Sequence, residues 1–159
     1  METSKQVSVY LENKPGRLAR VLSALAREKV NITALTVMDS HEHSVLRLVA
    51  NDVAKTQQVL SSLGTPYATT DVLLVELKNQ PGALARVCEL LGAEHVNIDY
   101  CYCSSGGRNG KVYGIFKVSN NEKAMRVLGG GMGNNSKRRV QARQLRNRRA
   151  YQAPGKTVS

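Results

Sequence analysis

Residues 6–12 alternate between apolar and polar positions, as expected of a half-buried strand. Val7, Val9 and Leu11 fall on one face, and Tyr10 and the polar residues on the other. A Pro-Gly turn follows, and the next apolar residues recur at helical spacing, at Leu18, Val21, Leu22 and Leu25. This spacing predicts a helix with one apolar face, and Pro15 suits its first turn because proline lacks an N–H.

The next segments predict a second strand over 32–38, a polar turn over 40–42 and a third strand over 44–51. Asp52 is a suitable cap for a second helix that ends at Gly64. A short strand over 67–70 then runs almost directly into the apolar run that begins at Val72. The order βαββαβ predicts a ferredoxin-like unit, with helices on one face of an antiparallel sheet.

The whole pattern occurs twice with a period of 66 residues, since Asn13-Lys14-Pro15-Gly16 corresponds to Asn79-Gln80-Pro81-Gly82, and Asn31-Ile32 to Asn97-Ile98. A repeat of this length indicates two copies of one small domain. The predicted fold is therefore α+β, with two ferredoxin-like units over residues 1–70 and 71–130 and a basic, disordered tail over 131–159. In the second unit we expect strands over 72–78, 98–104 and 111–118, a helix over 82–94 and a glycine-rich hairpin over 105–110.

The end of the second unit departs from this pattern. A helix over 121–128 is predicted to break at Gly129-Gly130-Gly131, and no apolar alternation follows it. The second unit is therefore predicted to lack its own final strand. That absence would leave the backbone of residues 72–78 open to pairing with another chain or with the tail. A replaced or frame-shifted coding end is the other explanation for the tail.

These two copies resemble the ACT domain, a small amino-acid-sensing module attached to many enzymes of amino-acid metabolism. The resemblance covers residues from about Gln6 to Leu128 and is to a stand-alone pair of repeats with no fused enzyme. It implies a regulatory protein that is not an enzyme. It also implies that domains pair side by side, with the effector between the Pro-Gly turn of one domain and the second strand of its neighbour.

The residues themselves also favour an anion site at each Pro-Gly turn. Backbone N–H groups at a helix start lack intrahelical partners, and the helix dipole attracts negative charge. Gly16 and Gly82 would let a carboxylate approach the backbone, and the neighbouring asparagines offer donors and acceptors that suit a zwitterion. The alternative is that these asparagines serve turn chemistry alone.

With the positions that the resemblance adds, the predicted ligand-binding set is Leu11, Asn13, Pro15, Gly16, Asn31 and Ile32 in the first repeat, and Leu77, Asn79, Pro81, Gly82, Asn97 and Ile98 in the second. In serine-sensing relatives a histidine stands two residues before the first asparagine. Leu11 and Leu77 stand there in this chain, so the resemblance favours an apolar amino acid over serine.

The formal charge of +11 is concentrated at the end of the chain. From Gly129 onward there are eight Lys or Arg and no Asp or Glu, which leaves +3 for the two repeats. An arginine-rich segment of this kind can neutralise phosphates, so an interaction module whose tail binds nucleic acid is the alternative function. A solvated, disordered extension is the simpler interpretation of the same residues.

The remaining signals predict no metal, cofactor or catalytic site. Cys88, Cys101 and Cys103 lack metal-binding spacing and correspond to Leu22, Leu35 and Val37 of the first repeat, so we expect buried, reduced core residues. His41-Glu42-His43 is expected to be a solvated turn, since two ligands make a poor metal site.

Localisation and partners follow from what the sequence lacks and from the resemblance. There is no apolar stretch of about 18 residues and no apolar core near the N-terminus. The prediction is therefore a cytoplasmic protein without membrane contact. Its expected partners are a free amino acid, a second copy in a homodimer, and an enzyme or transporter of amino-acid metabolism.

Overall fold

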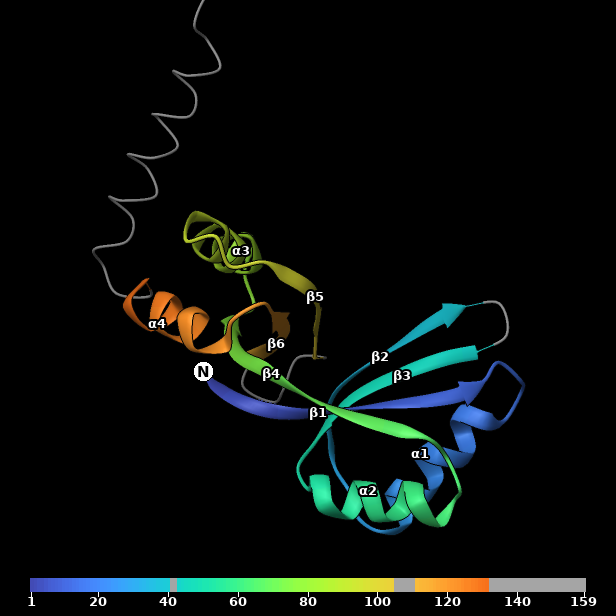
Figure 1. Ribbon diagram of the computed structural model, residues 1–159. Helices are drawn as coiled ribbons and strands as arrows, with labels where there is room; N and C mark the ends of the chain where they lie inside the picture. Colours follow the sequence, from blue (N-terminus) through green and yellow to red (C-terminus); the bar gives the residue numbers. More distant parts are fainter. Residues whose placement is uncertain (41–42, 105–110, 132–159) are drawn as a thin grey trace, which may run out of the picture.

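A single sheet runs through both repeats in the structure, a computed structural model that describes residues 1–40, 43–104 and 111–131 (Figure 1). Its strands are β1 (Glu2–Glu12), β2 (Ile32–Ser40), β3 (His43–Ala50), β4 (Tyr67–Lys78), β5 (Ile98–Cys103) and β6 (Lys111–Val118), and its helices are α1 (Arg17–Arg27), α2 (Val53–Ser62), α3 (Ala83–Ala93) and α4 (Asn121–Gly131). The strand order is β2-β3-β1-β4-β6-β5, and every pairing is antiparallel. The predicted fold class of two ferredoxin-like units is confirmed.

Two long strands, β1 and β4, each belong to both units. The second half of β1, from Gln6, pairs with β3 in the first unit, while Glu2–Ser4 pairs with Leu74–Val72 in the second unit. In the same way, residues 67–70 of β4 close the first sheet and residues 73–78 pair with β6. The first unit therefore takes its last strand from the start of β4, which then continues into the second unit. The second unit takes the corresponding strand from the start of β1, which then continues into the first unit.

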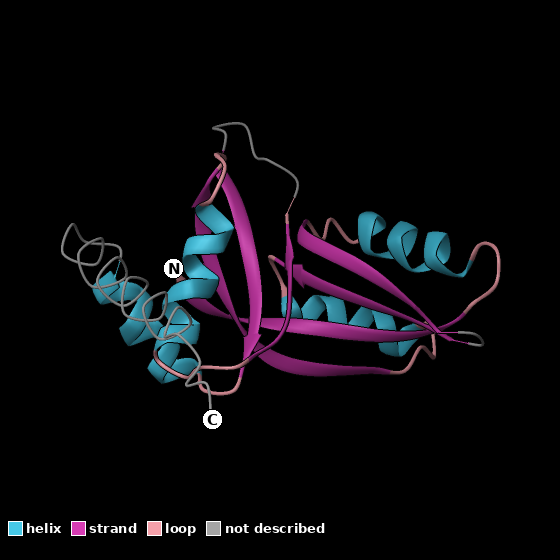
Figure 2. Cartoon of the chain, turned by 90° about the horizontal axis from the view of Figure 1, so that it is seen from above, coloured by secondary structure: helices cyan, strands magenta, loops and turns pink. Residues whose placement is uncertain are grey.

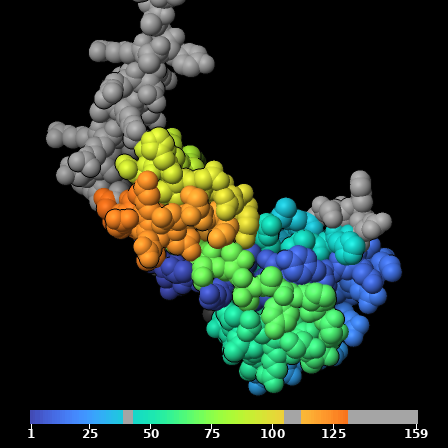
Figure 3. Space-filling view, viewed as in Figure 1, coloured from blue at the N-terminus to red at the C-terminus, as the bar shows by residue number. Residues whose placement is uncertain are grey.

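This exchange explains the strand that the second unit was expected to lack. The predicted open edge is wrong over Val72–Leu74, because Glu2–Ser4 occupies it. The start of β1 also contacts the last described helix, where Thr3 Oγ1 donates to Met125 Sδ at 3.2 Å. Figure 3 shows these N-terminal residues, in blue, beside the orange and green residues of the second unit. The predicted tail interactions of residues 132–159 lie outside the described residues.

The helices cover the outside of the sheet and form one core in each unit. Val7, Val9 and Leu11 of β1 pack with Val21 and Leu25 of α1. The equivalent side chains of β4 and α3 form the second core, together with Phe116, Ala124 and Leu128. Figure 2 shows the helices of the two units at opposite ends of the molecule. Each fully buried aliphatic or aromatic side chain stabilises the fold by roughly 1.5–3 kcal/mol.

The helix-free face of the sheet curls inward, so that the outermost strands β2 and β5 contact each other. A third apolar cluster fills the inside of this curl and draws on both units, with Ala34, Val49, Val72, Leu74 and Ile115 as its buried members. Gln6 is also fully buried on this face. The two units are thus joined by continuous strands and by a shared interior.

The glycines near residue 129 do not break the last helix, contrary to prediction. Helix α4 runs from Asn121 to Gly131. Its start is capped by Asn120, whose Oδ1 accepts from the backbone N–H of Lys123 at 2.9 Å. Ala124 and Leu128 are fully buried against the second core. This packing offsets the roughly 1 kcal/mol by which each glycine disfavours a helix.

The prediction that the cysteines are buried core residues is also wrong. Cys101 and Cys103 are exposed and Cys88 is half-buried. The alignment with the first repeat holds, but its reference residues are themselves exposed, with Leu35 at 42% and Val37 at 44%. Leu35 and Val37 lie on β2, and Cys101 and Cys103 lie on β5. These are the two outermost strands of the sheet, beyond the part that the helices cover. Apolar character at these positions therefore reflects an uncovered sheet margin.

No helix within residues 1–40, 43–104 and 111–131 is long and apolar enough to cross a membrane.

Candidate functional site

The two Pro-Gly turns have the same backbone in both repeats. Gly16 (φ 84°) and Gly82 (φ 83°) lie in the left-handed region and cap α1 and α3. In each turn the N–H four residues after the glycine donates to the glycine carbonyl, from Arg20 at 2.9 Å and from Arg86 at 3.0 Å. The predicted place of the proline in the first helical turn is wrong, because Pro15 and Pro81 precede the glycine cap.

Glycine is needed here for its backbone conformation. An added Cβ at Gly16 or Gly82 would meet no atom within 4 Å, so space alone does not exclude a side chain. The positive φ does, because an L-residue is strained in that region. The open space beside both glycines also leaves the backbone accessible from outside, as the proposed approach of a carboxylate requires.

The helices that follow these turns differ from the other two at their N-termini. Neither α1 nor α3 receives a hydrogen bond from a capping side chain. In contrast, Asp52 Oδ1 accepts from the N–H of Lys55 in α2 at 2.9 Å, and Asn120 caps α4. The first N–H of each helix, from Arg17 and Ala83, donates to the carbonyl of Lys14 and Gln80 at 3.3 Å. The N–H groups that follow in the first turn of α1 and α3, and the positive end of the helix dipole, receive no capping side chain and are available to an anion.

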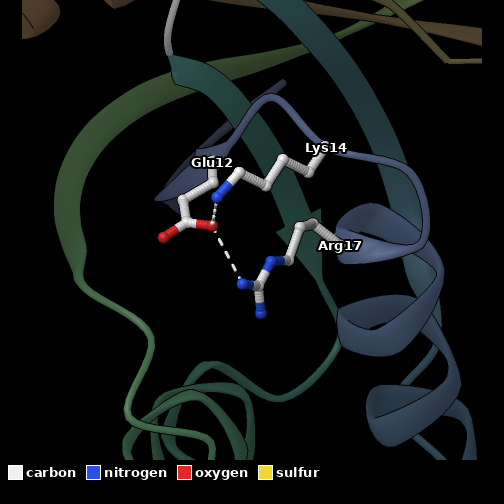
Figure 4. A network of polar contacts seen from close by, with 3 residues as sticks. All are labelled: Glu12, Lys14 and Arg17. Carbon is white, nitrogen blue, oxygen red and sulfur yellow. Dashed lines mark hydrogen bonds and ion pairs between the residues drawn. The ribbon is translucent and has the colours of Figure 1, made fainter.

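The charged side chains around the two turns are different. In the first, one oxygen of Glu12 accepts from Arg17 at 2.9 Å and lies 3.2 Å from Lys14 Nζ (Figure 4). The hydrogen bonds from Lys14 and Arg17 lower the pKa of the Glu12 carboxyl. The second turn has Lys78, Gln80 and Ala83 at the equivalent positions. The two turns therefore share a backbone but would meet a charged ligand differently.

Asn31 and Asn97 form the junction between helix and strand in each repeat. The backbone N–H of Asn31 donates to Asn51 Oδ1 at 2.9 Å, and its carbonyl accepts from the N–H of Asn51 at 3.0 Å. Asn97 makes the same pair of contacts with Ser119, and its side chain donates to Asp99 Oδ1 at 2.9 Å. The backbones of both residues thus take part in the turn between helix and strand.

The predicted site residues separate into two groups. Asn13, Pro15 and Gly16 are exposed, as are their equivalents Asn79, Pro81 and Gly82. The four apolar members face the two cores: Leu11 and Leu77 are buried in them, and Ile32 and Ile98 pack against them. Asn31 and Asn97 are exposed.

The turn and the second strand of one domain do not meet. The turn follows Glu12, which pairs with His43 at the start of β3. Ile32, at the start of β2, pairs with Ala50 at the other end of β3. Seven residues of strand separate these levels, which is roughly 20 Å along the sheet. The two turns lie still farther apart, since they end two antiparallel strands that point in opposite directions. A turn and the start of the second strand of the same domain therefore do not form a cleft with each other.

Other predicted features are placed only in part. Residues 41 and 42 of the His41-Glu42-His43 turn, and the glycine-rich hairpin over 105–110, lie outside the described residues. Among the residues that are described, no group of three or more His, Cys, Asp or Glu is arranged to hold a metal ion. Sequence reasoning did not single out Gln6, whose polar side chain lies fully buried between the two units. The alternation puts Gln6 on the face of the strand opposite Val7 and Val9, and this position was the signal in the sequence that it lies on the helix-free face of the sheet.

A family profile described as an ACT domain pair matches residues 2–134. Among solved structures, protein BT0572 from Bacteroides thetaiotaomicron has a TM-score of 0.74 and 35% sequence identity, covering 80% of this chain and 88% of that chain. The ligand-free regulatory subunit of aspartate kinase from Thermus thermophilus has a TM-score of 0.61 at 13% identity, covering 84% and 99%. The corresponding subunit from Thermus flavus has a TM-score of 0.56 at 16% identity, covering 84% and 94%.

No curated protein matches the chain. The residues that match the profile include all the strands of the two ferredoxin-like units. The chain therefore belongs to the ACT domain family and contains two ACT domains in one polypeptide.

Proposed function

We propose that this protein is a non-enzymatic regulator that binds a free amino acid at its Pro-Gly turns and transmits the binding to a partner of amino-acid metabolism. The observation that carries the proposal is the difference between the helix starts. Only α2 and α4 are capped by side chains among the four described helices. The uncapped starts of α1 and α3 are the two that follow a left-handed glycine turn.

The ligand class follows from these groups. The carboxylate of an amino acid would accept hydrogen bonds from the N–H groups that follow Arg17 or Ala83 in the first helical turn. Asn13 or Asn79 would contact the ammonium group through its amide oxygen. Leu11 and Leu77 lie in the cores beneath the turns, so each site would have an apolar floor, with the charged side chains of Glu12, Lys14 and Arg17 beside the first turn. This arrangement favours an amino acid with an uncharged side chain.

A second copy of the chain would complete each site. Strand β2 is outermost in the sheet and leaves three apolar side chains more than 40% exposed, namely Leu35, Val37 and Met38. Pairing of this margin with a second copy would cover apolar surface and an open strand edge. It would also bring a neighbouring strand toward a turn, as Asn31 and Ile32 require. The proposed active form is therefore a homodimer or larger oligomer.

The similar structures support a partner in amino-acid metabolism. Two of them are regulatory subunits of aspartate kinase, and the family profile contains no catalytic domain. By analogy, the partner of this chain would be an enzyme or transporter of amino-acid metabolism in the cytoplasm. Ligand would shift the equilibrium between two forms of the pair only if it bound one form more tightly.

A thermal-shift scan of the full chain against the twenty amino acids tests the proposal. A ligand at a hundredfold over its dissociation constant adds about 2.7 kcal/mol to stability, which is several degrees for a chain of this size. One or a few amino acids should raise the melting temperature, and Asn13→Ala with Asn79→Ala should abolish the shift. The matched control is Gln58→Ala on the exposed side of α2, which should leave it unchanged.

No shift with any amino acid would contradict the proposal and favour the alternative, an interaction module with a nucleic-acid-binding tail. The eight Lys and Arg from Gly129 onward support that alternative. It predicts an affinity for RNA or DNA that falls steeply with salt concentration and disappears when residues 132–159 are deleted.

A further inference from the structure

The side chain of Gln6 makes three hydrogen bonds, and two of them join the two domains. It stands on β1, and its Nε2 donates to Ser8 Oγ at 3.1 Å and to the Tyr100 hydroxyl at 2.8 Å. Its Oε1 accepts from the Tyr102 hydroxyl at 3.0 Å. Both amide hydrogens and the amide oxygen are therefore used, although the residue is 0% exposed. Because a buried amide without partners is costly, the position of β5 relative to β1 is closely specified.

The first domain makes a second contact with Tyr100, over its ring. The guanidinium carbon of Arg47, on β3, lies 3.8 Å from the centre of the Tyr100 ring. Arg47 Nη1 donates in turn to Met38 Sδ on β2 at 2.9 Å. A cation over an aromatic ring is attracted by the negative face of the ring. Tyr100 of the second domain thus contacts both β1 and β3 of the first domain, through Gln6 and Arg47.

The equivalent positions across the repeat have no such polar contacts. Gln6 and Ser8 correspond to Val72 and Leu74, and Tyr100 and Tyr102 correspond to Ala34 and Thr36. Val72, Leu74 and Ala34 belong instead to the apolar cluster inside the curl of the sheet. Tyr102 packs against that cluster, so the polar and apolar contacts adjoin. One half of the interface between the domains is therefore polar, and the other half is apolar.

We propose that Gln6, Tyr100 and Tyr102 form a polar latch that fixes the angle between the two ACT domains, with the apolar cluster of Ala34, Val49, Val72, Leu74 and Ile115 as its hinge. On opening, the latch groups exchange their mutual hydrogen bonds for bonds to water, at a modest net change in free energy. The apolar cluster would lose buried area if it separated, so it stays closed. Opening therefore swings β5 away from β1 and leaves both helical cores intact.

The latch lies between the two candidate ligand sites without belonging to either. Gln6 is on the strand that leads to Leu11 and Asn13, and Tyr100 is two residues from Ile98. The inference does not depend on the proposed amino-acid ligand, because it concerns the geometry of the unliganded chain. A thermal-shift scan in which no amino acid binds would therefore not contradict the polar latch.

Pulsed electron paramagnetic resonance on the full chain measures the angle as a distance. Spin labels are attached at Ser23→Cys on α1 and Glu89→Cys on α3, which are exposed and equivalent positions. The background carries Cys88→Ala, Cys101→Ser and Cys103→Ser. An excess of unlabelled protein restricts the signal to distances within one chain. The unaltered latch should give one narrow distance distribution.

Tyr100→Phe with Tyr102→Phe removes both hydroxyl contacts and keeps the rings. The population with a changed distance should rise roughly fivefold for each hydrogen bond lost. Tyr113→Phe is the matched control, because Tyr113 packs against the same apolar cluster and its hydroxyl makes no hydrogen bond to a described residue. It should leave the distribution narrow.

An unchanged distribution in the double variant would overturn the inference, and so would equal broadening in Tyr113→Phe. Circular dichroism confirms that each variant is folded. If the double variant does not fold, Tyr102→Phe alone is measured and judged by the same criterion.

Discussion

Lys5 and Asp71 pair directly across β1 and β4, and their side chains form an ion pair of 2.7 Å. They are also equivalent residues of the repeat, 66 positions apart. The pairs on either side are related by the same repeat: Glu2 pairs with Leu74, and their repeat equivalents Ala68 and Ser8 also pair with each other. The internal twofold axis of the molecule therefore passes between Lys5 and Asp71.

The exchanged ends of the strands should matter far more than the ion pair at the axis. Both charged side chains are about half exposed, at 54% and 49%, so Lys5→Ala should cost under about 1 kcal/mol. Deletion of residues 2–5 removes the backbone pairing of Val72–Leu74 and should cost a few kcal/mol, at about 1 kcal/mol for each hydrogen bond. Urea unfolding of both variants measures the difference. Equal effects would show that the exchanged segment contributes little.

The two domains should unfold in a single transition, because β1 and β4 run through both. Leu25 and Leu91 are equivalent and fully buried, one in each core. Leu25→Ala and Leu91→Ala should each lower the free energy of unfolding by about 2–5 kcal/mol. Hydrogen exchange should show that either variant loosens the amides of both cores. Loosening confined to the altered core would contradict the prediction.

Gly16→Ala should destabilise the protein by roughly 1–2 kcal/mol, because alanine is strained at positive φ. Gly92→Ala is the control: an added Cβ again meets no atom within 4 Å, but this glycine lies inside α3 with no positive φ. Alanine there should stabilise by roughly 0.5–1 kcal/mol. Thermal unfolding of the two variants should thus shift in opposite directions. A shift in the same direction would show that φ does not decide the effect.

Stability should fall at alkaline pH through Tyr102. Burial, with a smaller effect of Tyr100, raises the pKa of the Tyr102 hydroxyl far above the ordinary value of a tyrosine. A raised pKa in the folded state gives stability that is complete below the unfolded value, near 10, and is lost as pH rises above it. Unfolding measurements between pH 9 and 11 should show a decline that Tyr102→Phe reduces. An unchanged slope in that variant would assign the decline to other groups.

The sequence predicted the elements well because each one carries its own periodicity. The alternation of Val7, Val9 and Leu11 and the helical spacing from Leu18 to Leu25 correspond to β1 and α1. Asp52 caps α2 as expected, and Gly64 has a positive φ of 63° after the helix. These are local signals, which need no knowledge of the neighbours.

The misses concern relations between distant segments. No periodicity in residues 2–5 shows that they pair with residues 71–74, since Glu, Thr, Ser and Lys are polar on both faces. The exposure of Cys101 depends on which strand is outermost, and the burial of Gln6 depends on how the sheet curls. For the candidate site, the turns were recognisable, but their distance from the second strands follows only from the register. The ligand contacts of Asn13 and Asn79 stay a prediction.

The exchange of strands has a consequence for the inheritance of this gene. Recombination between two similar repeats can excise one of them and leave a single unit. That unit would keep a long first strand whose initial residues no longer have a partner in their own chain. Two such products could restore the lost pairing with each other, and the axis beside Lys5 would then relate two separate molecules. The covalent tandem thus fixes as one polypeptide an arrangement that a shorter ancestor could have formed as a dimer.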